Sequence, residues 1–143
     1  MKTLKILTFV PITLIMSLAF NQPGFSQTPV ISIDSQMKKD PLVINRTLEG
    51  KVQSDCGNIT NQPNQIIQIK ESLPYLRLTV EGEGKPTMVI DGPGGRFCVL
   101  ADNYSQNKPE LAGFWQAGNY LLKIGNLSPG QHNYTISISQ KNK

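Results

Sequence analysis

The chain has 143 residues, with 14 basic and 10 acidic side chains and a formal net charge of +4 at pH 7. That length suits one domain with a hydrophobic core of its own. Apart from two short clusters, the lysines and arginines are scattered, which argues against a nucleic-acid-binding protein.

The first 26 residues have the pattern of a secretory signal peptide. Two lysines precede an apolar run over residues 6–20, and small residues occupy positions −3 and −1 of a cut before Gln27. The alternative, a membrane anchor, is disfavoured because the apolar run is shorter than the ~20 residues of a spanning helix. We therefore expect residues 1–26 to be removed on export, which leaves a secreted or periplasmic chain without a membrane span.

A polar lead-in over residues 27–41 follows, and short β-type segments begin within it and continue beyond it. The clearest alternation places Leu76, Leu78 and Val80 on one face, which we expect to point inward. Residues 54–64 are rich in Asn, Gly, Pro and Ser and are predicted to form turns throughout. The strands predicted in this half are residues 30–33, 42–44, 47–52, 66–69 and 75–81.

The sequence Asp-Gly-Pro-Gly-Gly at residues 91–95 predicts a hairpin turn. Proline fixes its own φ, and glycine adopts positive φ without a steric penalty. The flanking β-type segments are residues 87–91 and 96–101. A phosphate-binding glycine loop would lead into a helix instead. We expect the rest of the sheet to be built around this hairpin.

Three further strands are predicted beyond a polar loop at residues 103–110. They are residues 111–115, 119–124 and 133–139. No stretch beyond the leader shows sustained 3.6-residue periodicity, and short strands about ten residues apart are typical of a β-sandwich or a small barrel. The prediction is an all-β protein with a single sandwich domain over residues 42–140.

Two cysteines, Cys56 and Cys98, lie in the exported part of the chain. An oxidising compartment favours a disulfide between them. The alternative is a pair of free buried thiols. A zinc site is poorly supported because His132 is the only histidine and there is no Cys-x-x-Cys motif.

Several motifs occur in a fixed order along the chain. They are Cys-Gly at residues 56–57, Val-Ile-Asp-Gly-Pro-Gly-Gly at 89–95, Cys-x-x-x-Asp-Asn at 98–103, Gly-Phe-Trp-Gln-Ala-Gly-Asn-Tyr at 113–120, and Tyr-x-Ile-x-Ile at 134–138. This order resembles that of the bacterial pre-peptidase C-terminal (PPC) domains and their stand-alone secreted relatives, over residues 48–139. The resemblance implies a jelly-roll-like β-sandwich without catalytic activity. Such domains accompany secreted peptidases or other exported enzymes, and some bind calcium or matrix polymers.

The sequence does not predict an enzyme. Nucleophilic catalysis needs a nucleophile, a base and an orienting group. We interpret His132 as a solvated turn residue, and no Gly-x-Ser-x-Gly motif occurs.

Aromatic residues form the first candidate binding set. Exposed rings on a sandwich can stack on sugars, and Tyr104, Phe114 and Trp115 are predicted to lie near one loop region. The alternative for Trp115 is that it caps the core.

Oxygen-bearing side chains at strand ends and in turns form the second set. They are Asp55, Asp91, Asp102 and Asn103. Calcium takes six to eight oxygen ligands, often from such positions. The alternative is that these residues only make turns.

The function predicted from the sequence is a non-catalytic, exported binding or accessory module at the cell envelope or outside the cell. An exported protein or a polysaccharide is the predicted partner. No cofactor is predicted, with calcium as the alternative. The alternatives are a glycan- or calcium-dependent adhesion module and, more distantly, a small hydrolase.

Overall fold

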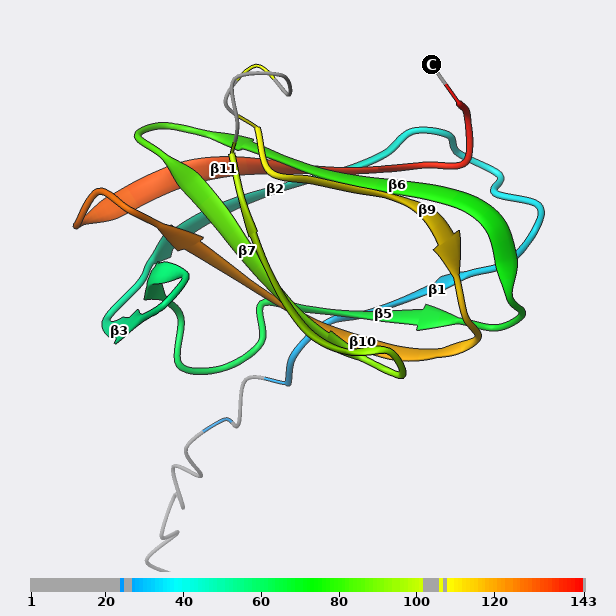
Figure 1. Ribbon diagram of the computed structural model, residues 1–143, viewed down its shortest axis with the longest axis horizontal. Coiled ribbons are helices and arrows are strands. Elements are labelled where there is room, and N and C mark those ends of the chain that lie inside the picture. The colour runs from blue at the N-terminus through cyan, green and yellow to red at the C-terminus, as the bar shows by residue number, and fades with distance from the viewer. Residues whose placement is uncertain (1–23, 25–26, 102–105, 107, 143) are drawn as a thin grey trace, which may run out of the picture.

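The computed structural model describes residues 24, 27–101, 106 and 108–142. Within these residues there is no helix, and the strands form two sheets that pack face to face (Figure 1). This confirms the all-β sandwich with a jelly-roll-like architecture. Except for residue 24, the predicted leader lies outside the described residues. The described part contains no helix long and apolar enough to cross a membrane.

The larger sheet has seven strands and is organised around β10. One side of β10 pairs with β7, which pairs in turn with β8; the other side pairs with β5 and then β4. β1 runs parallel to β5 at one edge, and β3 pairs with β4. The strands of this sheet are β1 (Val30–Ile33), β3 (Val52–Ser54), β4 (Gly57–Ile59), β5 (Gln65–Ile69), β7 (Pro86–Gly92), β8 (Gly95–Leu100) and β10 (Gly118–Asn126).

The smaller sheet is antiparallel, with four strands in the order β2-β11-β6-β9. Its strands are β2 (Leu42–Glu49), β6 (Leu73–Gly82), β9 (Glu110–Trp115) and β11 (Gln131–Ser139). The chain passes from β8, an edge strand of the larger sheet, to β9, an edge strand of the smaller one. Both strands border the same side of the sandwich.

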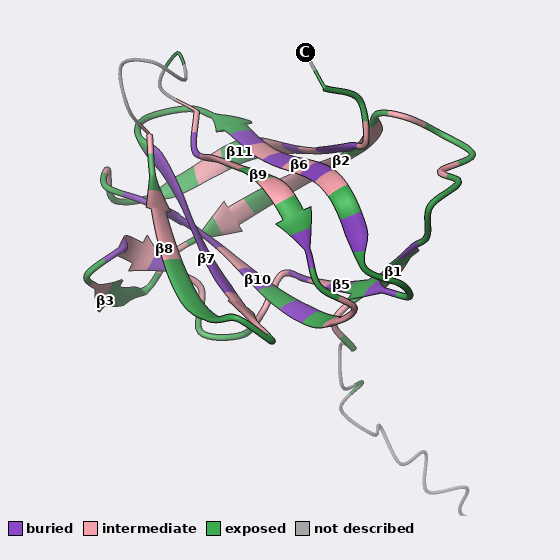
Figure 2. Ribbon diagram, turned by 45° about the vertical axis from the view of Figure 1, so that its right-hand side comes forward, coloured by how far each residue is buried: buried purple, intermediate pink, exposed green. Residues whose placement is uncertain are grey.

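Alternating apolar side chains fill the space between the sheets. Figure 2 shows buried positions recurring along β6, as the period-2 pattern predicts. The inward-facing side chains predicted on β6 are all buried, and so are the alternating apolar side chains of β10 and β11. They are Leu76, Leu78, Val80, Tyr120, Leu122, Ile124, Tyr134, Ile136 and Ile138.

A second, smaller core covers the outer face of β7. Met88 and Ile90 face the main core, whereas Val89 packs with Cys56 and Ile59 of the β3–β4 hairpin. Cys98 lies opposite Val89 on β8 and forms a disulfide with Cys56, with the Cα atoms 5.7 Å apart. The predicted bridge is confirmed.

Three predictions about the strands are wrong in their details. The β7–β8 hairpin lies at an edge of its sheet, with β10 in the middle. Residues 57–59 form β4, although their composition predicted only turns. β2 is one strand instead of two, and it ends before Gly50. The β3–β4 hairpin passes so close to Gly50 that a Cβ there would lie 2.0 Å from the Asn58 carbonyl oxygen.

Candidate functional site

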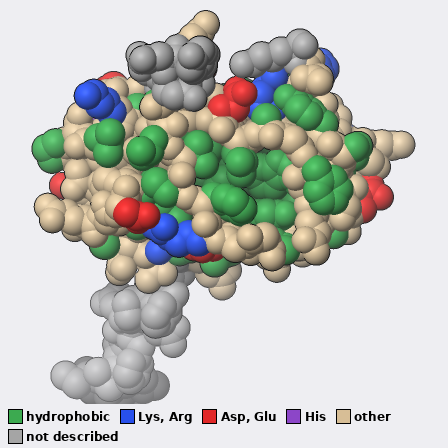
Figure 3. Space-filling model, viewed as in Figure 1, with side chains coloured by type: hydrophobic (Ala, Val, Ile, Leu, Met, Phe, Trp, Pro, Cys, Tyr) green, Lys and Arg blue, Asp and Glu red, His purple; other side chains and the backbone are tan. Residues whose placement is uncertain are grey.

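An apolar groove opens between the edge strands β8 and β9. Figure 3 views this face of the molecule and shows hydrophobic side chains gathered around the groove. The groove has a volume of about 220 Å³. Its lining residues are Ile90, Gly94, Phe97, Leu111, Ala112, Phe114, Trp115, Gln116 and Tyr120. None of them carries a charge.

Two phenylalanines, one on each edge strand, stand at the rim of the apolar groove. Phe114 on β9 is 69% exposed and Phe97 on β8 is 46% exposed. Phe114 was one of the predicted ligand-binding residues, and its ligand-binding role stays a prediction. Sequence reasoning missed Phe97, although its position beside the glycine turn on a short apolar strand was a usable signal.

Trp115 and Tyr120 form the floor of the groove. Trp115 is 3% exposed, and its Nε1 donates to the carbonyl oxygen of Leu76 at 3.0 Å. The two ring centroids lie 4.7 Å apart, and the Tyr120 hydroxyl donates to the carbonyl oxygen of Gln116 at 2.8 Å. Burial raises the pKa of Tyr120, so the ring stays neutral. Trp115 therefore belongs to the core, and the floor is held in place before any ligand arrives.

Two of the predicted calcium residues, Asp55 and Asp91, are described by the structure, and both are associated with Arg96. The carboxylate of Asp55 accepts two hydrogen bonds from Arg96, at 2.8 and 3.2 Å, and these lower its pKa. Asp91 lies opposite Arg96 across the β7–β8 hairpin. Among the residues described, no three His, Cys, Asp or Glu side chains are grouped for a metal. Tyr104, Asp102 and Asn103 lie outside these residues, and calcium binding stays a prediction.

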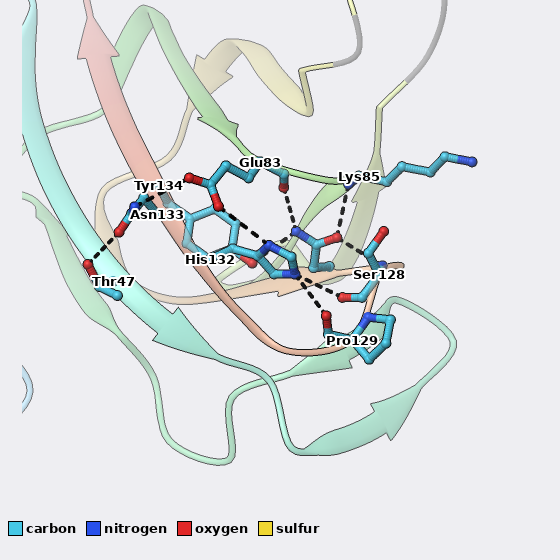
Figure 4. Close-up of polar contacts among 9 residues, drawn as sticks. Thr47, Glu83, Lys85, Ser128, Pro129, His132, Asn133 and Tyr134 are labelled. Carbon is cyan, nitrogen blue, oxygen red and sulfur yellow. Dashed lines mark hydrogen bonds and ion pairs between the residues drawn. The ribbon is translucent and has the colours of Figure 1, made fainter.

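His132 lies in strand β11, and its interpretation as a solvated turn residue is wrong. Only 14% of its side chain is exposed. Its Nε2 lies 3.2 and 3.1 Å from the carbonyl oxygens of Ser128 and Pro129, and its Nδ1 lies 3.9 Å from a carboxylate oxygen of Glu83 (Figure 4). Because carbonyl oxygens only accept, Nε2 carries the proton and cannot serve as a base. The ring holds the β10–β11 turn.

Asn126 is buried and is the centre of a polar network that shares Ser128 with His132. Its Nδ2 donates to the Glu83 carbonyl oxygen at 2.8 Å and to the Tyr134 hydroxyl at 3.1 Å. Its Oδ1 accepts from the backbone N–H groups of Lys85 and Ser128, both at 2.9 Å. The side chain therefore ties the β6–β7 loop to the β10–β11 turn. The bond to Ser128, two residues on, is the Asx turn that Asn favours at a strand end.

Comparison with solved structures identifies the architecture. The pre-peptidase C-terminal domain of a collagenase from Bacillus anthracis superposes with a TM-score of 0.51 at 16% sequence identity, and the match covers 77% of this chain and 94% of that domain. The chain has a PPC-like fold.

Two further proteins match this chain, one by structure and one by sequence. PliG of Aeromonas hydrophila, a periplasmic inhibitor of g-type lysozyme, superposes with a TM-score of 0.45 at 11% identity, over 78% of this chain and 96% of PliG. An uncharacterized protein of Synechococcus elongatus is 37% identical over 90 residues, which are 60% of this chain and 66% of that relative. The match thus spans slightly less than two thirds of the relative's length. No family model matches the chain.

Proposed function

We propose that this protein is a non-catalytic, exported binding module whose apolar groove receives apolar side chains from a segment of a protein partner. The observation that carries the proposal is the pair of exposed phenylalanines at the rim of the preformed apolar groove. Phe114 and Phe97 leave 69% and 46% of their surface in water. Burying apolar surface contributes about 25 cal/mol per Å², so an occupant that covers both rings gains binding energy from each.

The size and chemistry of the apolar groove limit its occupant. Its volume of about 220 Å³ is smaller than the roughly 300–1,000 Å³ of sites for drug-sized ligands and cofactors. Its uncharged lining offers no partner to a charged substrate. One or two apolar side chains fit these limits.

The strands that border the apolar groove favour an extended segment as the occupant. Within the described structure, β8 pairs only with β7, and β9 only with β6. An edge strand has backbone groups free to pair with an added strand. The groove thus combines space for side chains with edges that can hold a backbone.

A second copy of the chain is a poorer occupant. Large apolar side chains offer about 150–250 Å² each, so the exposed fractions of Phe97, Leu100 and Phe114 amount to about 300 Å². A stable dimer buries roughly 800 Å² on each partner. A short segment matches the smaller area.

Two observations support the rest of the proposal. The leader sequence and the Cys56–Cys98 disulfide are typical of an exported chain. His132, the only histidine in the sequence, has its Nε2 turned to two carbonyl oxygens, so this nitrogen is not available as a catalytic base.

Phe114→Ser should weaken binding to this groove without disturbing the fold. A phage-displayed peptide library is selected on the immobilised wild-type protein, and synthetic copies of the selected peptides are measured by calorimetry. We expect an aromatic or large aliphatic anchor in these peptides. Loss of the Phe114 contact should raise Kd at least about tenfold, since burying a Phe side chain is worth about 1.5–3 kcal/mol.

Leu127→Ser is the matched control. Leu127 is 49% exposed and follows β10 in the β10–β11 turn, outside the groove lining. Peptides should bind this variant as tightly as they bind the wild type. Peptides that bind Phe114→Ser and Phe97→Ser as tightly as the wild type would refute the proposal.

A further inference from the structure

A polar hollow of about 490 Å³ lies on the four-stranded sheet, over β2, β11 and β6. The hollow is open to solvent along the face of the sheet. The apolar groove shares no lining residue with it. Arg46 is also in the lining, with its guanidinium donating to the Asn45 carbonyl oxygen and to Oε1 of Gln65. The other side chains that give the hollow hydrogen-bonding capacity are Asn45, Thr47, Glu81, Glu83, Asn133 and Thr135.

Four of these side chains form two cross-strand pairs between β2 and β11. Asn45 lies opposite Thr135, and Thr47 lies opposite Asn133. The Thr135 hydroxyl donates to Oδ1 of Asn45 at 2.9 Å, and the Thr47 hydroxyl donates to Oδ1 of Asn133 at 2.7 Å. In each pair, the hydrogen bond holds the asparagine side chain with Oδ1 toward the threonine and Nδ2 away from it. The side chains are ordered in advance, and so lose little rotamer freedom when a ligand binds.

Both carboxylates at the polar hollow have partners. Glu81 forms an ion pair with Lys108 at 2.6 Å. Glu83 accepts a hydrogen bond from Nδ2 of Asn133 at 3.3 Å, and it faces His132 at 3.9 Å (Figure 4). Both carboxylates and the Arg46 guanidinium already have partners, so none of them is left for an ionic ligand, and the described residues offer no compact acidic set for a cation. Charge therefore favours a neutral ligand.

The hydrogen-bonding chemistry identifies the class of this neutral ligand. The lining offers amide donors together with hydroxyl, amide and carboxylate acceptors, and a sugar hydroxyl both donates and accepts. An apolar occupant would take water from these polar groups without replacing their hydrogen bonds. We propose that the polar hollow binds a neutral glycan, with Asn45 and Asn133 as binding residues. This site is independent of the apolar groove.

Side-chain amide signals in ¹⁵N–¹H spectra test the proposal directly. The exported chain is titrated with cello-, xylo-, malto- and chito-oligosaccharides, each to 10 mM, and Asn45→Ala and Asn133→Ala assign the two amide pairs. We expect at least one oligosaccharide to shift both pairs in a saturable way. Each substitution should raise its Kd about fivefold, as the loss of a hydrogen bond predicts.

Asn119→Ala is the matched control, because Asn119 is an exposed asparagine on β10 of the other sheet. This variant and Phe114→Ser should bind the oligosaccharide as the wild type does, which separates the hollow from the groove. Inorganic phosphate should not compete. The proposal is overturned if none of the four oligosaccharides shifts the two amides, or if binding survives both substitutions unchanged.

Discussion

Serine in place of Cys56 or Cys98 should lower the melting temperature by about 15 °C. The disulfide joins residues 42 apart in sequence. For a loop of that length, the restriction of the unfolded chain is worth about 4 kcal/mol. In a domain of this size, a loss of about 4 kcal/mol lowers the melting temperature by about 15 °C. Differential scanning calorimetry of the two single variants, the double variant and the reduced wild type measures the effect.

The pattern across these samples matters as much as the size of the effect. All four lack the same bond, so their melting temperatures should agree within a few degrees. Reductant should not affect the double variant. A wild-type melting curve unmoved by reduction would contradict the prediction.

The disulfide also connects stability to the apolar groove. It joins the β3–β4 hairpin to β8, and two further contacts lie beside it: the Thr87 hydroxyl donates to the Cys56 carbonyl oxygen at 2.6 Å, and Arg96 forms an ion pair with Asp55 at 2.8 Å. β8 carries Phe97, one rim of the groove. Reduction should therefore weaken peptide binding even below the melting temperature.

Asn126→Ala should lower the free energy of unfolding by about 3–4 kcal/mol. The substitution removes four side-chain hydrogen bonds, each worth about 0.5–1.5 kcal/mol, and takes the side-chain acceptor away from two partly buried backbone N–H groups. Urea denaturation measures the change, and the slope should stay the same if only the native state is affected.

Asn119→Ala again provides the control, because it replaces an exposed asparagine on the same strand as Asn126. Its effect should stay within about 0.5 kcal/mol. A loss of less than about 1 kcal/mol for Asn126→Ala would show that other groups or water replace its bonds.

Local patterns in the sequence were enough to predict most strands. Alternation placed the inward face of β6 correctly, because a half-buried strand must alternate. The disulfide was predictable because export and a pair of cysteines imply it. β4 was missed because two of its three residues, Gly57 and Asn58, favour turns, and because the strand pairs with β10 only through the tertiary fold.

The candidate sites were harder to predict because they depend on distant pairing. The polar hollow joins Thr47 to Asn133 and Asn45 to Thr135, which lie 86 and 90 residues apart. No local motif shows that β2 and β11 are neighbours. Phe114 was among the predicted residues, but its neighbour across the groove, Phe97, depends on how the two sheets meet. His132 was misinterpreted because it also faces Glu83, which is distant in the sequence, although its two carbonyl partners lie only three and four residues before it.

The most direct test of the proposed function is where a selected peptide binds. Backbone ¹⁵N–¹H spectra of the exported chain are recorded during titration with a peptide selected on it. We predict that the shifted signals cluster on β8 and β9, around Phe97 and Phe114, and that signals on β2 stay in place. Shifts that cluster elsewhere and leave β8 and β9 unchanged would contradict the assignment of the apolar groove as the binding site.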